Sequence, residues 1–527
     1  MLNILTGYIK KKPLASIIIF SVLAYLPFLN KPFHIDDPFF LYAARAIGLS
    51  PLHPFDIAGA IDLWKHNYNP IFFYYFTALL RAVFGENEIF MHAGYFIFYV
   101  TAGIYFYLIC KAINIKGIAP ALLFLSSPIA LLAGTSIMSD FPLIALFLIS
   151  FYYFIAYLKN DSPLSMAISS LALLAAVFTK YYAGVFIFLY IIMLIICGKW
   201  KVLKYLSVIL SLLLAALFIY SHSHQIHPLY IFERLGWAHS PVRKETLSFL
   251  TTLGGISIFP LCYLLLMGKN AAKWVAYSTA LVISAVFCSM AGFGVFAVIS
   301  ASVYLANAVL VFFMAGERLY ISFKSKEYPV ISAMLWFFGY ALFLMIFPNI
   351  MAGRYVLPLL PPLILCLYIH VEETGRAGRS FSVIAVFSTL LLGLALNSAD
   401  YKLAGIYRDF AIEASGNISA PQTGYMGNYA FEYYMQKKGF ERFDIKKHKY
   451  LIMTKYGSVH VIYGGDPILK DIRKKFILAR EIPKEENYLL RIWDPTAFAG
   501  FHLNMFGYIP WGISAKPMET FYVFEKK

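Results

Sequence analysis

The chain has 527 residues, of which 60% are apolar and only 14% are Asp, Glu, Lys or Arg, and its formal net charge is +16. Soluble globular proteins are roughly 45–50% apolar and about 25% charged. This composition excludes a soluble enzyme, a disordered chain and a nucleic-acid binder with a solvated basic surface. It places the chain in a lipid bilayer.

The charged residues are concentrated at the C-terminal end of the chain. The last 128 residues contain 33 charged side chains, against 39 in the first 399. We therefore predict a transmembrane domain at residues 1–399 and a soluble α/β domain at residues 400–527. Within the latter, the pattern predicts a helix at 427–439 and strands at 450–455 and 521–524.

Apolar segments long enough to cross the hydrocarbon core, which takes about 20 helical residues, recur along the membrane domain. We predict 13 spans, near residues 14–29, 90–110, 118–134, 142–158, 163–178, 181–198, 202–220, 247–267, 274–291, 294–314, 329–347, 355–371 and 381–397. Residues 70–84 are apolar but too short to span and contain Arg81, so we expect a helix in the interface, as at residues 38–48. The fold class is thus mainly α, a polytopic membrane protein with interfacial helices in the first outer loop.

The cations fall on alternate loops, beginning with Lys10, Lys11 and Lys12. Because Lys and Arg accumulate in cytoplasmic loops, this pattern predicts a cytoplasmic N-terminus and an extracytoplasmic C-terminal domain. The first span lacks a small-residue cleavage site and is expected to be a retained anchor. The five cysteines all lie in or at the end of apolar runs, which favours packing between helices over disulfides or zinc sites.

Acidic residues are scarce in the membrane domain, so their positions are informative. Asp36 and Asp37 lie in the first outer loop, and Asp140 follows a predicted span at the outer surface. Asp37 precedes Pro38 and is suited to cap the interfacial helix, which leaves Asp36 as a candidate general base. A carboxylate such as Asp140 is costly beside apolar sequence unless it is paired, wetted or functional.

Two cations lie at the outer ends of spans. Lys180 interrupts two apolar runs, and Arg354 precedes the span at 355–371. They either anchor the protein to lipid headgroups or bind an anionic phosphate, which Arg suits through its bidentate fork. In the outer loop at 221–246, His224 and His227 are spaced to meet on one helical turn, where they are either interfacial histidines or ligands of a divalent cation.

The motifs resemble those of the GT-C glycosyltransferases, and most of all the protein O-mannosyltransferases and the aminoarabinose transferase of lipid A. The resemblance rests on the order of short motifs over residues 1 to about 400. These are Asp36-Asp37, Asn69-Pro70 opening an aromatic helix, Gly85-Glu86-Asn87-Glu88, Ser126-Ser127-Pro128 before Asp140, Thr179-Lys180-Tyr181, and Arg354-Tyr355-Val356-Leu357-Pro358. The chain departs from the group at Asp37, where Glu is frequent, and at Asn69, where the aminoarabinose transferase has Lys.

The resemblance implies an enzyme, a hexosyl- or pentosyltransferase that moves a sugar from a polyprenyl-phosphate donor to an outer-face acceptor by an inverting displacement. The acceptor would be a lipid, glycan or protein of the cell envelope, as in lipid A modification or protein glycosylation, and the location a bacterial inner membrane. Asp36, Asp37 and Asp140 would be catalytic. The substrate site would comprise Lys180, Arg354, Tyr355, Asn69 and Tyr230, with His224 and His227 as metal ligands.

Neither a nucleotide nor a nucleic acid is implied, in keeping with the absence of a phosphate-loop pattern from the sequence. The alternative is a polytopic transporter or flippase for a lipid-linked or anionic substrate. Such a protein would use the same outer cations and Asp140. It would also be expected to show internal repeats, which the hydropathy pattern does not contain, and acidic residues at mid-depth.

Overall fold

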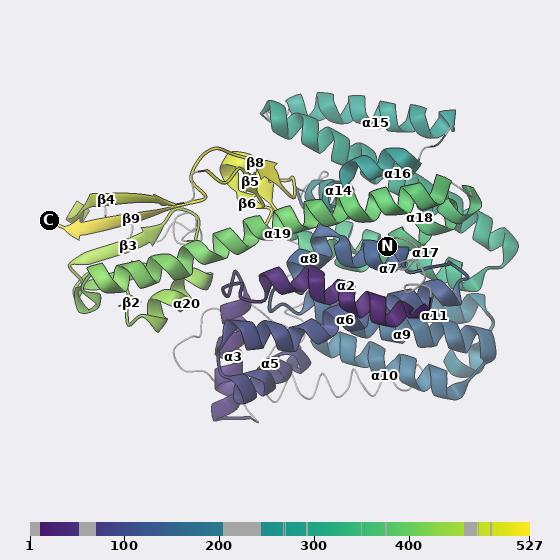
Figure 1. Cartoon of the computed structure of the whole chain (residues 1–527), viewed down its shortest axis with the longest axis horizontal. Helices are drawn as coiled ribbons and strands as arrows, with labels where there is room; N and C mark the ends of the chain where they lie inside the picture. Colours follow the sequence, from purple (N-terminus) through teal and green to yellow (C-terminus); the bar gives the residue numbers. More distant parts are fainter. Residues whose placement is uncertain are drawn as a thin grey trace.

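The computed structural model describes residues 11–51, 70–203, 244–266, 268, 270–290, 294–348, 350–374, 377–457, 472, 474–484 and 487–527. A bundle of helices forms one end of the molecule and a small sheet domain forms the other (Figure 1). The described part contains seven helices long and apolar enough to cross a membrane, and four shorter apolar helices. The chain is therefore an integral, multi-pass membrane protein.

The helices of the bundle follow the predicted segments closely. They are α2 (Pro13–Tyr25), η1 (Leu26–Phe28), α6 (Glu88–Ala112), α7 (Ala119–Ser126), α8 (Pro128–Gly134), α9 (Asp140–Asn160), α10 (Pro163–Thr179), η2 (Tyr181–Ala183), α11 (Gly184–Ile196), α14 (Lys244–Ile256), η3 (Pro260–Leu266), α15 (Ala271–Met290), α16 (Val295–Ser325), α17 (Tyr328–Ile346), η4 (Gly353–Leu359), α18 (Leu360–Thr374) and α19 (Ala377–Asn417). The segment predicted at 202–220 lies almost wholly outside the described residues, so the number of 13 spans stays a prediction.

Two predicted spans are broken in the structure. The segment at 118–134 forms α7 and α8, which are separated at Ser127. Pro128 restricts the preceding residue, and Ser127 accordingly has an extended ψ of 135°. The segment at 247–267 forms α14, which ends at Ile256, and the 3₁₀ helix η3, which begins at Pro260.

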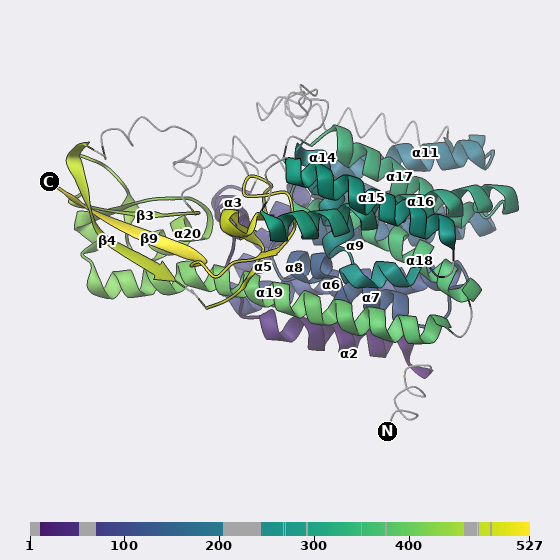
Figure 2. The ribbon, with the colours of Figure 1, turned by 90° about the horizontal axis from the view of Figure 1, so that it is seen from above.

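The two predicted interfacial segments are helical. They form α3 (Asp37–Leu49) and α5 (Ile71–Phe84), which pack against each other at the end of the bundle nearest the sheet domain (Figures 1 and 2). Their aromatic side chains join a buried cluster with residues of the sheet domain, including Phe40, Tyr74, Phe431, Tyr433 and Phe521. This shared core fixes α3 and α5 against the C-terminal domain.

The C-terminal domain is a mixed sheet covered by helices, as predicted. Its five strands are β1 (Thr423–Met426), β2 (Glu441–Arg442), β3 (Tyr450–Thr454), β4 (Phe476–Lys484) and β9 (Glu519–Lys526), in the order β2-β1-β3-β9-β4. The strand β1 pairs in parallel with β2 and β3, whereas β9 pairs antiparallel with β3 and β4. The helix predicted at 427–439 is α20 (Tyr429–Lys437). The strands β5 (Leu490–Arg491), β6 (Trp493–Asp494), β7 (Ala499–Gly500) and β8 (Gly512–Ile513) form two small hairpin-like pairs.

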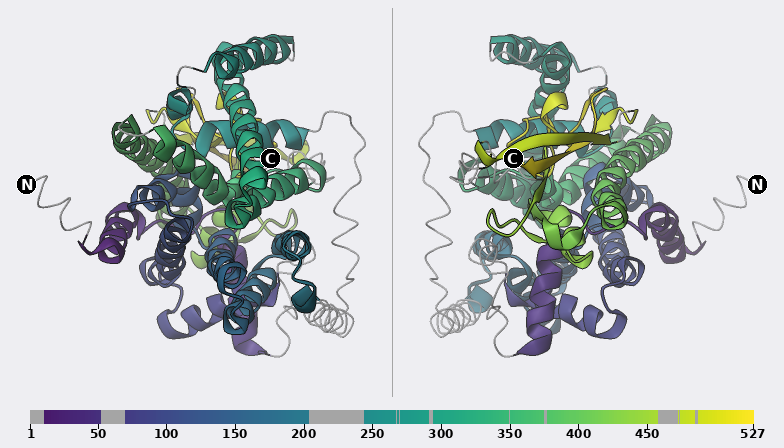
Figure 3. Two further views of the ribbon diagram at one scale, coloured as in Figure 1. Left: turned by 90° about the vertical axis from the view of Figure 1, so that its right-hand side faces the viewer. Right: turned by 90° about the vertical axis from the view of Figure 1, so that its left-hand side faces the viewer.

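The helix α19 runs unbroken from the bundle into the C-terminal domain (Figures 1 and 2). It passes through the predicted domain boundary at residue 399 without a change in helical structure, because the switch from apolar to polar composition alters its surroundings and not its backbone. The helix α15 lies at the edge of the bundle, along the top of Figures 1 and 3. The five cysteines are free, and four of them are buried, in line with the expected packing role.

Candidate active site

The candidate base Asp36 is presented by a tight turn that links α2 and η1 to α3. Ile35, just before it, has a φ of 48°, a left-handed conformation that is unusual for a β-branched residue. The Ile35 side chain is nevertheless buried, and its packing holds the turn in place. Non-glycine residues in this region cost about 1–3 kcal/mol and are found where the surrounding structure requires them, frequently at functional sites.

Four charged side chains of alternating sign form a chain at this end of the bundle. Arg354 Nη2 lies 2.8 Å from Asp36 Oδ2, and Arg354 Nε lies 3.3 Å from Asp140 Oδ2. Lys180 Nζ continues the chain, 2.6 Å from Asp140 Oδ1. The structure therefore brings together four of the predicted site residues, although up to 318 positions separate them in the sequence.

The exposure of these four side chains differs along the chain. Asp36 is 23% exposed, whereas Arg354, Lys180 and Asp140 are 11%, 10% and 7% exposed. In addition, Arg354 Nη1 is buried and has no hydrogen-bond partner among the described residues. A buried donor without a partner is costly, so the guanidinium retains capacity to bind a further acceptor. Asp36 is the carboxylate that substrate can reach most readily.

The elements that carry these residues are fixed by local constraints. Asp140 is the first residue of α9, and Lys180 is an extended residue between α10 and η2. Arg354 lies in η4, directly after Gly353, whose amide donates to the Phe501 carbonyl at 2.6 Å. A Cβ atom at Gly353 would lie 2.1 Å from the Phe501 ring. The C-terminal domain thus approaches the bundle closely at Arg354, which only glycine at position 353 permits.

Two tyrosines line the cationic part of the site. Lys180 Nζ lies 4.5 Å from the centre of the Tyr355 ring and 5.3 Å from that of Tyr182. The Arg354 guanidinium carbon is 5.4 Å from the Tyr355 ring centre. Cations over aromatic faces are held in place without loss of their charge. Tyr355 is therefore beside both predicted phosphate-binding cations, whereas Tyr182 was not anticipated from the sequence.

Asp37 has a different role from its neighbour. Its side chain is fully buried, and it accepts the backbone N–H of His34 at 2.9 Å and that of Ile137 at 2.8 Å. The prediction that Asp37 caps the interfacial helix is wrong: Asp37 is itself the first residue of α3, and its carboxylate binds backbone outside that helix. Burial raises the pKa of the Asp37 carboxyl to about 7, with the nearby Lys31 ammonium opposing that shift.

The acidic residues of the Gly85-Glu86-Asn87-Glu88 motif join α3 and α5 to the C-terminal domain. Glu86 binds Arg45 and Arg81 and accepts the Tyr433 hydroxyl at 2.9 Å. Burial acts to raise the pKa of Glu86, but the hydrogen bonds from Arg45 and Arg81 prevail and lower it to about 2. Glu88 binds Arg408 Nη1 at 2.8 Å and accepts the Tyr434 hydroxyl at 2.6 Å.

A second buried polar cluster was missed by the sequence analysis. Asp400, on α19, binds Lys31 Nζ at 2.5 Å and His502 Nε2 at 2.7 Å, and His34 Nε2 lies 3.3 Å away. One ligand atom each from His34, Asp400 and His502 lie within 4.8 Å of one another. The two imidazoles and a carboxylate are a donor set that a divalent cation such as Zn²⁺ accepts, and the Nδ1 atoms of both histidines have no partner among the described residues.

Tyr429, at the start of α20, was also not predicted as a site residue. Burial raises the pKa of its phenol, the charge of Asp36 adds to that rise, and the charge of Arg354 opposes it. Its φ is 62°, a second non-glycine left-handed residue beside the site. In the sequence, Asn428 indicates the start of a helix. It does not indicate that Tyr429 belongs to the site.

The other predicted site residues cannot be placed. Asn69, Tyr230, His224 and His227 lie outside the described residues. Their roles in substrate and metal binding stay predictions. Among the described residues, the site consists of the charge chain from Asp36 to Lys180, with Tyr355, Tyr182 and Tyr429 around it.

The chain is similar to solved structures but not to curated protein sequences. A comparison with curated protein sequences finds no match. The crystal structure of ArnT from Cupriavidus metallidurans in the apo state is similar with a TM-score of 0.44 and 12% sequence identity, covering 88% of this chain and 95% of that one. The structure of ArnT from Cupriavidus metallidurans bound to undecaprenyl phosphate has a TM-score of 0.42 and 13% identity, covering 86% and 94%.

A family comparison covers the stretch that carries two of the four charged residues. Residues 68–224, which include Asp140 and Lys180, match the family described as dolichyl-phosphate-mannose-protein mannosyltransferase. Over that stretch the chain thus has the sequence pattern of this GT-C mannosyltransferase family, and the resemblance inferred from the motifs is confirmed.

Proposed function

We propose that the protein is a GT-C glycosyltransferase that moves a sugar from a polyprenyl-phosphate donor to an acceptor on the outer face of the membrane. The observation that carries this proposal is the charge chain Asp36–Arg354–Asp140–Lys180, with its exposed carboxylate at one end and its buried cations beside it. A base next to a phosphate-binding pair of cations is what displacement of a lipid phosphate from a sugar requires.

The transfer forms one bond and breaks another. The acceptor hydroxyl or amine attacks the anomeric carbon, the bond from that carbon to the phosphate oxygen breaks, and polyprenyl phosphate leaves with the electron pair. Asp36 takes the proton of the acceptor. Attack opposite the leaving group inverts the anomeric configuration, so no covalent sugar–enzyme intermediate forms.

The cations stabilise the leaving group. Arg354 has a buried Nη1 donor without a partner among the described residues, and Lys180 lies beside it through Asp140. Negative charge grows on the phosphate oxygens as the bond breaks, and preorganised cations in a water-poor site bind it more strongly than the ground state. Tyr355, whose ring lies beside both cations, is our candidate for a further hydrogen-bond donor to the same phosphate.

The contact between Arg354 and Asp36 connects donor binding to the base. Arg354 Nη2 holds the Asp36 carboxylate at 2.8 Å. A phosphate that binds the guanidinium competes with Asp36 for it, which frees the carboxylate to accept a proton from the acceptor. Asp140, paired with both cations, keeps them in place during this exchange.

The surroundings of the site match a lipid-linked donor. The site lies where spans end beside α3 and α5, so a phosphate can stay at the membrane surface while its polyprenyl tail lies in the bilayer. The C-terminal domain meets the bundle at this end, where the Gly353 amide of η4 donates to the carbonyl of Phe501. We place the acceptor of the sugar, whether a lipid, a glycan or a protein, between the C-terminal domain and Asp36.

The His34–Asp400–His502 group is our candidate for the divalent cation, in place of the ligands outside the described residues. His34 lies in the turn that presents Asp36, and Asp400 and His502 come from α19 and the C-terminal domain, so a bound cation would hold that turn against both. We assign it no step in the transfer.

Transfer is tested with purified protein in liposomes that contain a polyprenyl-phosphate sugar and candidate acceptors. We expect sugar-dependent release of polyprenyl phosphate, and NMR of the product should show inverted anomeric configuration. Asp36→Asn should abolish release while the protein stays folded. Movement of the intact donor across the bilayer without transfer would contradict the proposal and support the transporter alternative.

A further inference from the structure

The bundle has a second charged region at the end opposite Asp36. Asp140 begins α9 and Arg354 precedes α18, so the far ends of these helices, at Asn160 and Thr374, lie on the other side of the bundle. Contacts there tie several helix ends together: Lys116 N–H donates to Glu372 at 2.7 Å, and Lys159 donates to the Ala112 carbonyl. This end is independent of the proposed sugar-transfer site.

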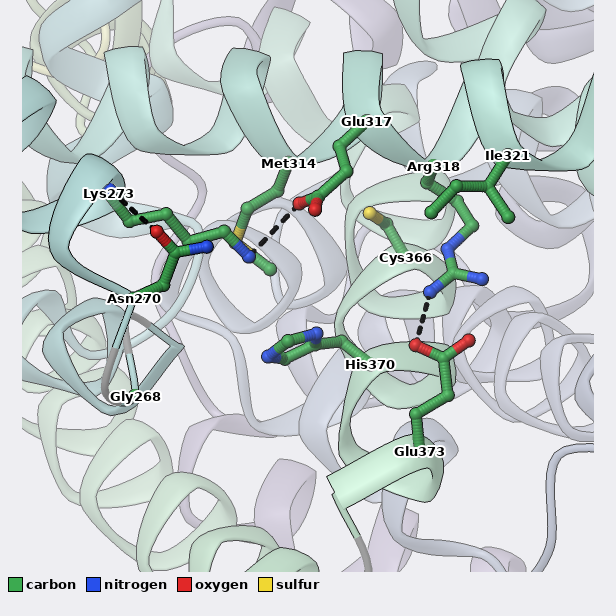
Figure 4. Close-up of a pocket in the computed structure, with 10 residues that line it drawn as sticks. All are labelled: Gly268, Asn270, Lys273, Met314, Glu317, Arg318, Ile321, Cys366, His370 and Glu373. Carbon is green, nitrogen blue, oxygen red and sulfur yellow. Dashed lines mark hydrogen bonds and ion pairs between the residues drawn. The ribbon is translucent and has the colours of Figure 1, made fainter.

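A cavity of about 310 Å³ opens at this end between α15, α16 and α18 (Figure 4). Its polar lining comprises Asn270, Lys273, Glu317, Arg318, His370 and Glu373. Lys273 Nζ lies 3.0 Å from Glu317 Oε2, and Arg318 Nη2 lies 2.6 Å from Glu373 Oε2. The two ion pairs face each other across the cavity in Figure 4.

The cations are buried, whereas their acidic partners are exposed. The side chains of Lys273 and Arg318 are 4% and 8% exposed, against 44% and 55% for Glu317 and Glu373. Positive charge is therefore fixed deep in the cavity and negative charge lies near its mouth. Exposed carboxylates lose little when they leave an ion pair, so an anion with better geometry can replace them at the cations.

The mouth of the cavity lies next to a surface suited to lipid. Ile321 lines the cavity and is 40% exposed, and the neighbouring helix α15 exposes Val275, Val282 and Val286. Trp274 is 44% exposed, and its indole N–H donates to the Gly268 carbonyl at 2.9 Å. Tryptophan with a polar partner at the end of an apolar helix is typical of the bilayer interface.

We propose that this cavity binds a phosphoethanolamine group, as carried by a membrane phospholipid. The phosphate binds Lys273 and Arg318, and the displaced carboxylates of Glu317 and Glu373 bind the ammonium group. Basic pockets between transmembrane helices are known sites for lipid headgroups. The two signs of charge, ordered by depth, distinguish this site from one for a purely anionic lipid.

The test is native mass spectrometry of the full-length protein after removal of bound lipid. Phosphatidylethanolamine, phosphatidylcholine and phosphatidylglycerol with identical acyl chains are added back. We expect phosphatidylethanolamine to bind most tightly, because the quaternary ammonium of phosphatidylcholine donates no N–H hydrogen bond and phosphatidylglycerol has no cation. Equal binding of all three lipids would overturn the proposal.

Variants separate the two halves of the site. Arg318→Ala should weaken binding of phosphatidylethanolamine and phosphatidylglycerol alike by about tenfold. The double variant Glu317→Gln and Glu373→Gln, which tests the site even if Arg318→Ala fails to fold, should weaken only phosphatidylethanolamine. The control Lys324→Ala removes an exposed cation from the same end of α16 and should change neither. An unchanged lipid preference in the double Gln variant would refute the ammonium half.

Soluble phosphoethanolamine distinguishes the two sources of the group. If it competes with phosphatidylethanolamine at millimolar concentration, the cavity recognises the headgroup alone. If it does not compete while the variants still reduce lipid binding, the acyl chains contribute and the source is the membrane. Competition that persists unchanged in Arg318→Ala would place the ligand elsewhere and overturn the proposal.

Discussion

Arg354 gives the sharpest test of the proposed chemistry, because one guanidinium binds two carboxylates and keeps a third nitrogen for the donor phosphate. It binds Asp36 at 2.8 Å and Asp140 at 3.3 Å, and its Nη1 has no partner among the described residues. Arg354→Ala removes the charge and all donors. Loss of one preorganised donor to a growing negative charge lowers kcat by about 100- to 1,000-fold, or about 3–4 kcal/mol of transition-state stabilisation.

Arg354→Lys separates charge from geometry. Lysine keeps the positive charge but has no planar fork, so it cannot hold Asp36, Asp140 and a phosphate together. We expect its kcat to exceed that of Arg354→Ala by about tenfold and to stay well below the wild type. Release of polyprenyl phosphate over a range of donor concentrations gives kcat and KM separately, and thermal unfolding monitors the fold.

The control for both variants is Lys447→Ala, which removes a 48% exposed cation that pairs with Glu441 far from the site. Its kinetics should equal those of the wild type. Wild-type kcat in Arg354→Lys would show that the fork geometry is irrelevant. Unchanged donor kinetics in Arg354→Ala would refute a phosphate-binding role altogether.

Three further results are expected. Asp36→Asn, which keeps the shape but not the basicity, should reduce kcat by about 100- to 10,000-fold with an unchanged melting temperature; a Glu variant with no activity and the Asn variant with full activity would together exclude a base at this position. The pKa of Glu86, lowered to about 2, means that its contacts stabilise the fold fully above about pH 4.5, the ordinary value, and lose that contribution as the pH falls toward 2. Thermal unfolding of Glu86→Gln should therefore show a weaker dependence on pH in this window, and parallel curves for the two proteins would contradict it. Elemental analysis of the purified protein should find a divalent metal that is lost in His502→Ala and kept in His448→Ala, a buried histidine outside the cluster; equal metal content in both variants would exclude the cluster as its site.

The positions of the helices could be predicted because each apolar run carries its own signal. Most described spans overlap the predicted segments, although the helices that end at Ser325 and Asn417 run well past the predicted ends at 314 and 397. The breaks at Ser127 and Ile256 follow from nearby prolines. Asp36, Asp140, Lys180 and Arg354 could be selected one by one, since charges beside apolar sequence are costly. Their pairing could not be predicted, because it depends on the packing of segments far apart in the chain.

The same reasoning explains what was missed. The sequence analysis gave Lys31 and Asp400 no role, yet the two form a fully buried ion pair. His34 and His502 stand in no sequence motif that would identify them as site residues. A contact between residues 369 positions apart leaves no local pattern.

The length of the helix α19 sets the distance between the bundle and the sheet domain. At 1.5 Å per residue its 41 residues extend over ~60 Å, about twice the hydrocarbon thickness. The C-terminal half of α19 sets both the distance of the sheet domain from the bundle and its rotation about the helix axis, because a helix is rigid along and around its axis. One inserted residue near position 398 would turn the domain by about 100° relative to the bundle and break the hydrogen bond between Gly353 and Phe501. An insertion of a whole number of turns would mainly move the domain away from the bundle. The placement of the C-terminal domain over the site thus depends on the number of residues in α19.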